Sequence, residues 1–63
     1  MRAQFAESRK FNGKIYYLYT SEGFKSDAKR VAWSLGGGGN LARVVTNTMI
    51  GGRQVYLIYY RRR

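Results

Sequence analysis

The dipeptide Asn12-Gly13 constrains the fold of this chain more than any other feature. Both central positions of a two-residue β-hairpin turn need positive φ, and Asn-Gly is the pair most often found there. Phe11 precedes the pair, and the segment after it, "KIYYLYT", consists mostly of aromatic and β-branched residues, which favour strands. The sequence therefore predicts a hairpin with strands at about residues 4–11 and 14–20. Its expected opposed pairs are Phe11 and Lys14, Lys10 and Ile15, Arg9 and Tyr16, and Glu7 and Leu18.

A helical period follows this hairpin. Ser26 is a suitable N-cap, Asp27 suits the positive end of a helix dipole, and Gly36 suits a helix stop. The sequence predicts a helix of about ten residues between them. Four residues share one face at 100° per residue: Ala28, Val31, Ala32 and Leu35.

The last third of the chain returns to a strand pattern. The segments "NLARVVTN" and "RQVYLIYY" are rich in β-branched and aromatic residues, and Gly51-Gly52 between them fits a two-residue turn. With that turn the opposed pairs are Ile50 and Arg53, Thr46 and Leu57, and Val44 and Tyr59. We therefore expect a single α+β domain over residues 1–63, ordered ββαββ, with two hairpins in a mainly antiparallel sheet. One helix covers one face, and Arg61, Arg62 and Arg63 form a flexible basic tail.

The length of the chain makes the second face of the sheet important. Sixty-three residues without cysteine form a thin core that no disulfide supports. One helix can cover only one face of a four-stranded sheet. The other face is then either wet or bound to something.

The charge is strongly basic. Twelve Lys and Arg face three acids, Glu7, Glu22 and Asp27, for a formal net charge of +9. Such a surface either keeps the chain soluble or attracts polyanions. Eight of the twelve cations are Arg, whose planar guanidinium suits phosphates and stacks on bases.

The six tyrosines lie on the second strands of the two predicted hairpins, three on each. We expect one group to face the helix: Ile15, Tyr17, Tyr19, Val44, Val55, Leu57 and Tyr59. Tyr16, Tyr56 and Tyr60 then lie on the open face with Arg9 and Arg43. Aromatic rings among cations bind single-stranded nucleic acid, because bases stack on the rings and cations neutralise phosphates. The alternative is that these rings fill the thin core and a dimer interface.

Trp33 and the tetraglycine leave further alternatives. Trp33 lies near Lys29 and Arg30, away from the apolar helix face, where it packs under the N-terminal arm or a second subunit, or stacks on a base. Gly36 to Gly39 follow a helix rather than precede one, so they predict a flexible connection and not a phosphate loop.

No catalytic group is recognisable. The chain has no His or Cys, and its three carboxylates are scattered. We expect no enzymatic activity, no metal and no cofactor. Without an apolar run of about 20 residues or a signal-peptide pattern, we expect no membrane partner and an intracellular location, cytoplasmic or nucleoid-associated.

Four segments together resemble a group of known proteins. The pattern "FNGKIYYLYTS", "SDAKRVAWSL", "ARVV" and "VYLIYYRRR" resembles small stand-alone basic proteins of archaea and archaeal viruses over most of the chain. Those with known roles are often nucleic-acid binders, so the resemblance implies such a role and names no catalytic residue.

The sequence thus predicts a non-catalytic protein that binds DNA or RNA largely independently of sequence. The predicted contacts are Arg9, Tyr16, Arg43, Arg53, Tyr56, Tyr60, Arg61, Arg62 and Arg63, with Trp33 as a stacking or interface residue. The alternative is an assembly module that forms a homodimer, or binds another partner, through the tyrosine-rich sheet face.

Overall fold

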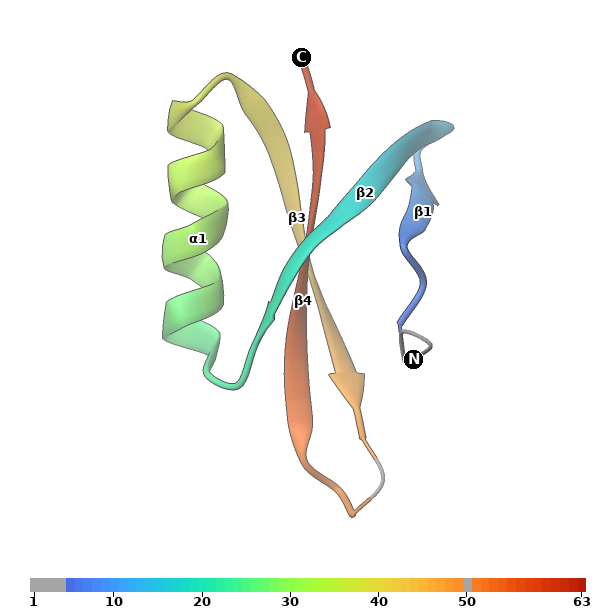
Figure 1. The fold of residues 1–63 in the computed structure, drawn as a ribbon, viewed down its shortest axis with the longest axis vertical. Helices are drawn as coiled ribbons and strands as arrows, with labels where there is room; N and C mark the ends of the chain where they lie inside the picture. The colour runs from blue at the N-terminus through green and yellow to red at the C-terminus, as the bar shows by residue number, and fades with distance from the viewer. Residues whose placement is uncertain (1–4, 50) are drawn as a thin grey trace.

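In a computed structural model, residues 5–49 and 51–63 are described, and they form one antiparallel sheet of four strands and one helix. The elements are β1 (Ser8–Phe11), β2 (Lys14–Glu22), α1 (Lys25–Gly37), β3 (Asn40–Thr48) and β4 (Gln54–Arg62). The strand order is β1-β2-β4-β3, and α1 and β1 lie on opposite sides of the β3–β4 pair (Figure 1). The predicted ββαββ order and α+β class are confirmed.

The first hairpin has the predicted turn and register. Asn12 has a φ of 51° and Gly13 a φ of 77°, as a primed turn requires. The observed pairs run from Phe11 with Lys14 to Arg9 with Tyr16. Beyond β1, the Leu18 N–H donates to the Glu7 carbonyl at 2.8 Å, which extends the same register. The described part of the first strand begins at Ser8, later than predicted, and Gln4 lies outside the described residues.

Helix α1 is longer than predicted at both ends. Its N-cap is Phe24 and not Ser26, because the Ala28 N–H already donates to the Phe24 carbonyl at 3.1 Å. Asp27 lies in the first turn as expected. The helix continues through Gly37, so only the last two glycines of the tetraglycine connect it to β3. Of the predicted apolar face, Ala28 is buried and the other three residues are half-buried.

The register of the second hairpin differs from the prediction by one residue. Thr46 pairs with Tyr56 and not with Leu57, and Val44 pairs with Ile58 and not with Tyr59. The cause is the connection: the Met49 N–H donates to the Arg53 carbonyl at 2.7 Å, which makes the loop longer than two residues. Ile50, expected to oppose Arg53, lies outside the described residues.

This shift changes the faces of the sheet, because side chains alternate along each strand. Ile58 is fully buried on the side of α1, which packs mainly on β3 and then on β4. Val55, Leu57 and Tyr59 point to the other side, where they form the main core cluster with Tyr16. Their predicted place under the helix is therefore wrong.

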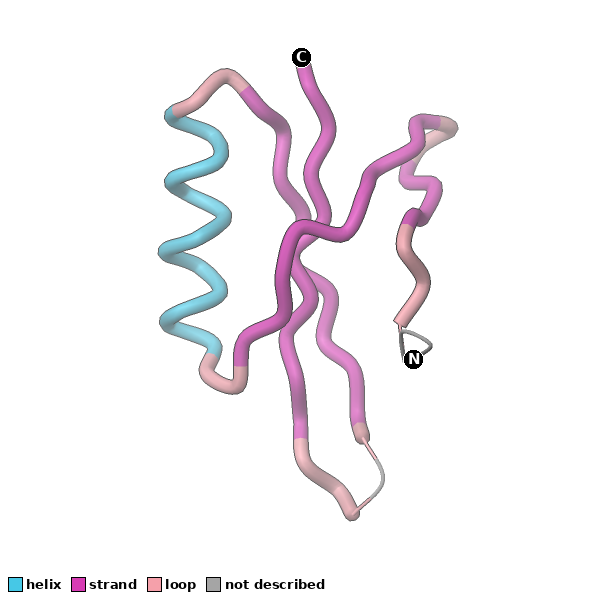
Figure 2. The backbone as a smooth tube through the Cα atoms, in the orientation of Figure 1, coloured by secondary structure: helices cyan, strands magenta, loops and turns pink. Residues whose placement is uncertain are grey.

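The face opposite the helix is covered by the chain itself. The β1–β2 hairpin bends away from the β3–β4 pair and curls over that face (Figure 2). The register between β2 and β4 shifts between Leu18 and Thr20, and such a bulge bends a strand. The Phe11 ring lies 5.2 Å from the Tyr16 ring and 6.0 Å from the Tyr59 ring, and the Tyr59 hydroxyl donates to the Ala6 carbonyl at 2.8 Å. The second face, expected to be either wet or bound to something, is thus a largely closed layer of the chain itself.

The C-terminal residues belong to the sheet rather than to a tail. Strand β4 continues to Arg62, so Arg61 pairs with Leu41 and Arg62 with Asn40. The Arg63 N–H lies 3.4 Å from the Gly39 carbonyl that accepts its hydrogen bond. Within the described ranges, no helix has the length and apolar character needed to cross a membrane.

Candidate nucleic-acid interface

One stretch of β2 leaves large side chains uncovered on the helix side of the sheet. Ile15 is 48% exposed, Tyr17 55% and Tyr19 56%. A helix about 10–12 Å wide covers about two strands spaced about 4.8 Å apart. Because α1 packs over β3 and β4 and touches β2 least, these side chains project beyond its cover.

Tyr60 from the neighbouring strand completes this group. It pairs with Tyr17 across the β2–β4 ladder. Its ring meets the Tyr19 ring edge to face, with centroids 5.8 Å apart and planes at 81°. The bulge explains this contact, since Tyr19 is left unpaired between the Leu18 and Thr20 pairs. We call Tyr17, Tyr19, Tyr60 and Arg62 the tyrosine surface.

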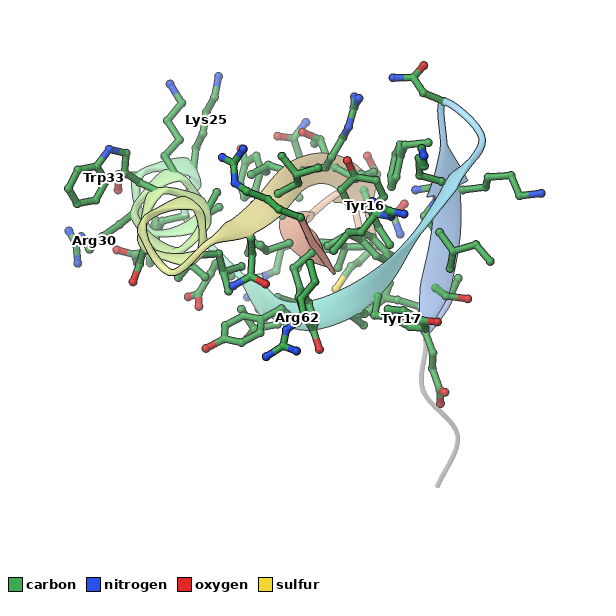
Figure 3. All side chains as sticks on the ribbon, turned by 90° about the horizontal axis from the view of Figure 1, so that it is seen from above. Tyr16, Tyr17, Lys25, Arg30, Trp33 and Arg62 are labelled. Atoms are coloured by element: carbon green, nitrogen blue, oxygen red, sulfur yellow. The ribbon has the colours of Figure 1, made fainter. Side chains whose placement is uncertain are left out.

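Arg62 places a cation among these rings. It lines, together with Tyr17, two shallow hollows of about 440 and 570 Å³. Figure 3 shows Arg62 and Tyr17 on the same side of β2, with Tyr16 on the opposite side. Lys14 and Arg61 line the first hollow, and none of the described residues around either hollow is acidic. The tyrosine surface therefore combines exposed rings with uncompensated positive charge.

A second group of cations lies on the opposite side, over the core cluster. The Arg43 guanidinium is 5.2 Å from the centre of the Phe11 ring, and that of Arg9 is 5.8 Å from the same centre. Both arginines are exposed while they stack on these rings. They remain accessible to an anion, but they do not adjoin the tyrosine surface.

The structure separates the residues that the sequence grouped together. Tyr16 is 6% exposed and packs in the core, so its predicted role in stacking is wrong. Tyr56 is half-buried and pairs with Thr46 and Glu22, far along β4 from Tyr60. Of the nine predicted contacts, Tyr60 and Arg62 belong to the tyrosine surface, and Arg61 lines a hollow beside it. The other six lie outside it: Arg9, Tyr16, Arg43, Arg53, Tyr56 and Arg63.

Tyr17 and Tyr19 are the aromatic residues that the prediction missed, because it placed them under the helix. Their face was correct, but the extent of helical cover was not. The exposure of Tyr17 and Tyr19 could have been predicted from the width of one helix, which covers about two strands and leaves the other two strands of the sheet uncovered.

Trp33 lies apart from this surface. It is 83% exposed on the outer side of α1, beside Arg30 (Figure 3). It packs on no arm within the described residues. Among residues 5–49 and 51–63, no three side chains of the His, Cys, Asp or Glu type lie close enough together to hold a metal ion.

No family model, curated protein or solved structure matches this chain in the three comparisons made with known proteins.

Proposed function

We propose that this protein binds nucleic acid without catalysing a reaction, and that it does so through the tyrosine surface. The observation that carries the proposal is that Tyr17 and Tyr19, each more than half exposed, lie beside Arg62. None of the described residues that line the two hollows here is a carboxylate. Lys14 and Arg61 extend the positive charge along β2 and β4.

Stacking and charge supply the binding energy in this proposal. A base stacked on an aromatic ring contributes about 1–3 kcal/mol and does so for any base. The edge-to-face contact with Tyr60 supports the ring of Tyr19, which reduces the entropy lost when a base stacks on it. Arg62, Arg61 and Lys14 neutralise phosphates, which carry no sequence information. Binding is therefore largely independent of sequence.

Single strands are the preferred ligand. Stacking on a protein ring requires a base that is free of its duplex neighbours, and such bases occur in single strands, loops and ends. The surface lies on the twisted strand β2, and it offers no helix or ribbon that would enter a major groove.

A homodimer through the same surface is the competing function. The exposure of aliphatic Ile15 beside Tyr17 favours it, because an aliphatic side chain gains from burial and offers no ring for stacking. The positive charge on both copies opposes it.

Salt dependence separates the two functions. Labelled single-stranded DNA, single-stranded RNA and duplex DNA are titrated by fluorescence anisotropy at three salt concentrations, and the mass of the free protein is measured by light scattering. We expect tighter binding to the single strands, and an affinity that falls with salt by about 0.7 logarithmic units per decade for each phosphate contacted. A doubled mass that returns to a monomer in Tyr17→Ala, with no binding to any nucleic acid, would instead establish the dimer.

A further inference from the structure

Within residues 5–49 and 51–63, strand β3 has a free edge along its whole length. The strand order gives it one neighbour, β4, and the ladder between them is unbroken from Asn40 to Thr48. Natural sheets usually protect such an edge with Lys, Pro, a bulge or a covering segment. The nine residues of β3 include one charged side chain, Arg43, and no proline.

The direction of the free backbone groups follows from the ladder. Two hydrogen bonds at the ends of the β3–β4 pair show which residues of β3 bond to β4. The Met49 N–H donates to the Arg53 carbonyl at 2.7 Å, and the Arg63 N–H donates to the Gly39 carbonyl at 3.4 Å. On the β3 side, both bonds involve odd-numbered residues. Hydrogen-bonded pairs alternate in an antiparallel ladder. The N–H and C=O groups of Ala42, Val44 and Thr46 therefore point away from β4.

A groove lies beside this edge. It has a volume of about 600 Å³ and runs between α1 and β3. Its apolar lining includes Ala32, Trp33 and Val44, of which Trp33 is 83% exposed and Val44 is 38% exposed. Lys29 and Arg63 also line it, and none of the described lining residues is acidic. The groove therefore suits a ligand that is both apolar and negatively charged.

The free edge selects a polypeptide over nucleic acid. It presents donors and acceptors in alternation, and another β-strand satisfies both. A phosphodiester backbone offers acceptors without matching donors, which would leave the carbonyls of Ala42, Val44 and Thr46 unpaired.

The charge selects a different protein over a second copy. Two copies joined by a twofold axis at this edge would each bring Lys29 and Arg63 to the shared groove, and β3 has no carboxylate to offset them. A segment that carries Asp or Glu removes this repulsion.

We propose that the β3 edge binds an extended acidic segment of another protein, which adds a fifth strand to the sheet and packs an apolar side chain against Trp33. This site is separate from the tyrosine surface, and it does not depend on the proposed binding of nucleic acid.

The fluorescence of Trp33 tests the proposal directly, because Trp33 is the one tryptophan of the chain. The probe is a synthetic peptide, VEVEVEV, with both ends blocked. Two controls are VKVKVKV, which reverses the charge, and VEVEVEV methylated on every backbone nitrogen, which cannot donate to a strand edge. We expect a saturable blue shift of Trp33 emission with the first peptide and none with the two controls.

Two variants locate the binding at the edge. Val44→Pro removes an N–H that points away from β4, so the existing ladder is kept, as for prolines on natural edge strands. We expect it to weaken peptide binding by roughly two- to tenfold for the lost hydrogen bond alone. Val44→Thr keeps both the N–H and the branched side chain, and it should bind as the unmodified protein does. Far-UV circular dichroism verifies that both variants fold.

Several results would overturn the proposal. One is that VEVEVEV causes no blue shift of Trp33 emission. Another is that the methylated peptide causes the same shift as VEVEVEV, a result that does not depend on the folding of any variant. A shift that grows with protein concentration alone, together with a doubled mass, would assign the edge to a second copy. Displacement of the bound peptide by a single-stranded oligonucleotide, with the same change in Trp33 emission, would assign the groove to nucleic acid.

Discussion

Tyr16 and Tyr17 are neighbours in β2, and replacing each by alanine should have opposite consequences for folding. Tyr16 is 6% exposed and lies against Phe11 and Tyr59, whereas Tyr17 is 55% exposed on the other side of the strand. Tyr16→Ala should therefore remove part of the core. Tyr17→Ala should leave the core intact.

The magnitudes follow from the buried areas. A tyrosine offers about 200 Å², nearly all of it buried at Tyr16, and about 25 cal/mol per Å² gives a loss of roughly 4–5 kcal/mol for Tyr16→Ala. Less than half of Tyr17 is buried, so the same arithmetic gives about 2 kcal/mol as an upper estimate. A chain of 63 residues has a free energy of unfolding of roughly 3–9 kcal/mol. Tyr16→Ala thus removes much or all of the stability, and Tyr17→Ala does not.

Urea denaturation followed by far-UV circular dichroism measures the difference. Circular dichroism is the better probe because Trp33 is already exposed in the folded protein. We expect a folded baseline and a slightly lower midpoint for Tyr17→Ala, and a transition shifted to low urea, or none, for Tyr16→Ala. Equal losses for the two variants would refute the assignment of faces. A Tyr16→Ala protein as stable as the unmodified one would refute the curl of the first hairpin over the core.

Three further changes test other parts of the account. Gly13→Val should lower the free energy of unfolding by roughly 1–3 kcal/mol, measured by thermal melting. No atom lies within 4 Å of the added Cβ, so the loss comes from the φ of 77° and not from a clash. Unchanged melting would exclude a primed turn. Tyr59→Phe should cost roughly 0.5–1.5 kcal/mol in urea, because it removes the bond to the exposed Ala6 carbonyl; a loss as large as that of Tyr16→Ala would contradict this. Arg62→Ala should weaken binding to all single strands alike and reduce the salt slope by about 0.7 in anisotropy titrations; an unchanged slope would remove Arg62 from the interface.

The first hairpin and the helix face could be predicted from the sequence because local chemistry determines them. Asn12-Gly13 allows one short turn, and that turn sets the register of every pair around it. The spacing of Ala28 and Leu35 on one face likewise follows from the helical period alone.

The second hairpin and the site could not be predicted in the same way. Gly51-Gly52 tolerates positive φ in loops of more than one length, and one additional residue exchanges the two faces of β4 relative to β3. The exposure of Tyr17 and Tyr19 depends on how far α1 extends over β2, and the burial of Tyr16 depends on the curl of β2. Both are properties of the assembled sheet rather than of a local pattern.

The most direct test of nucleic-acid binding by the tyrosine surface is a comparison of three proteins with one labelled single-stranded oligonucleotide at constant salt. The proteins are the unmodified chain, the double variant Tyr17→Ala/Tyr19→Ala, and the control variant Phe24→Ala. Phe24 is 70% exposed and does not belong to the tyrosine surface, so the control removes an exposed ring elsewhere. Two lost stacking contacts should weaken binding by about thirtyfold or more, whereas Phe24→Ala should bind like the unmodified protein. A double variant that folds and binds with unchanged affinity would contradict the account.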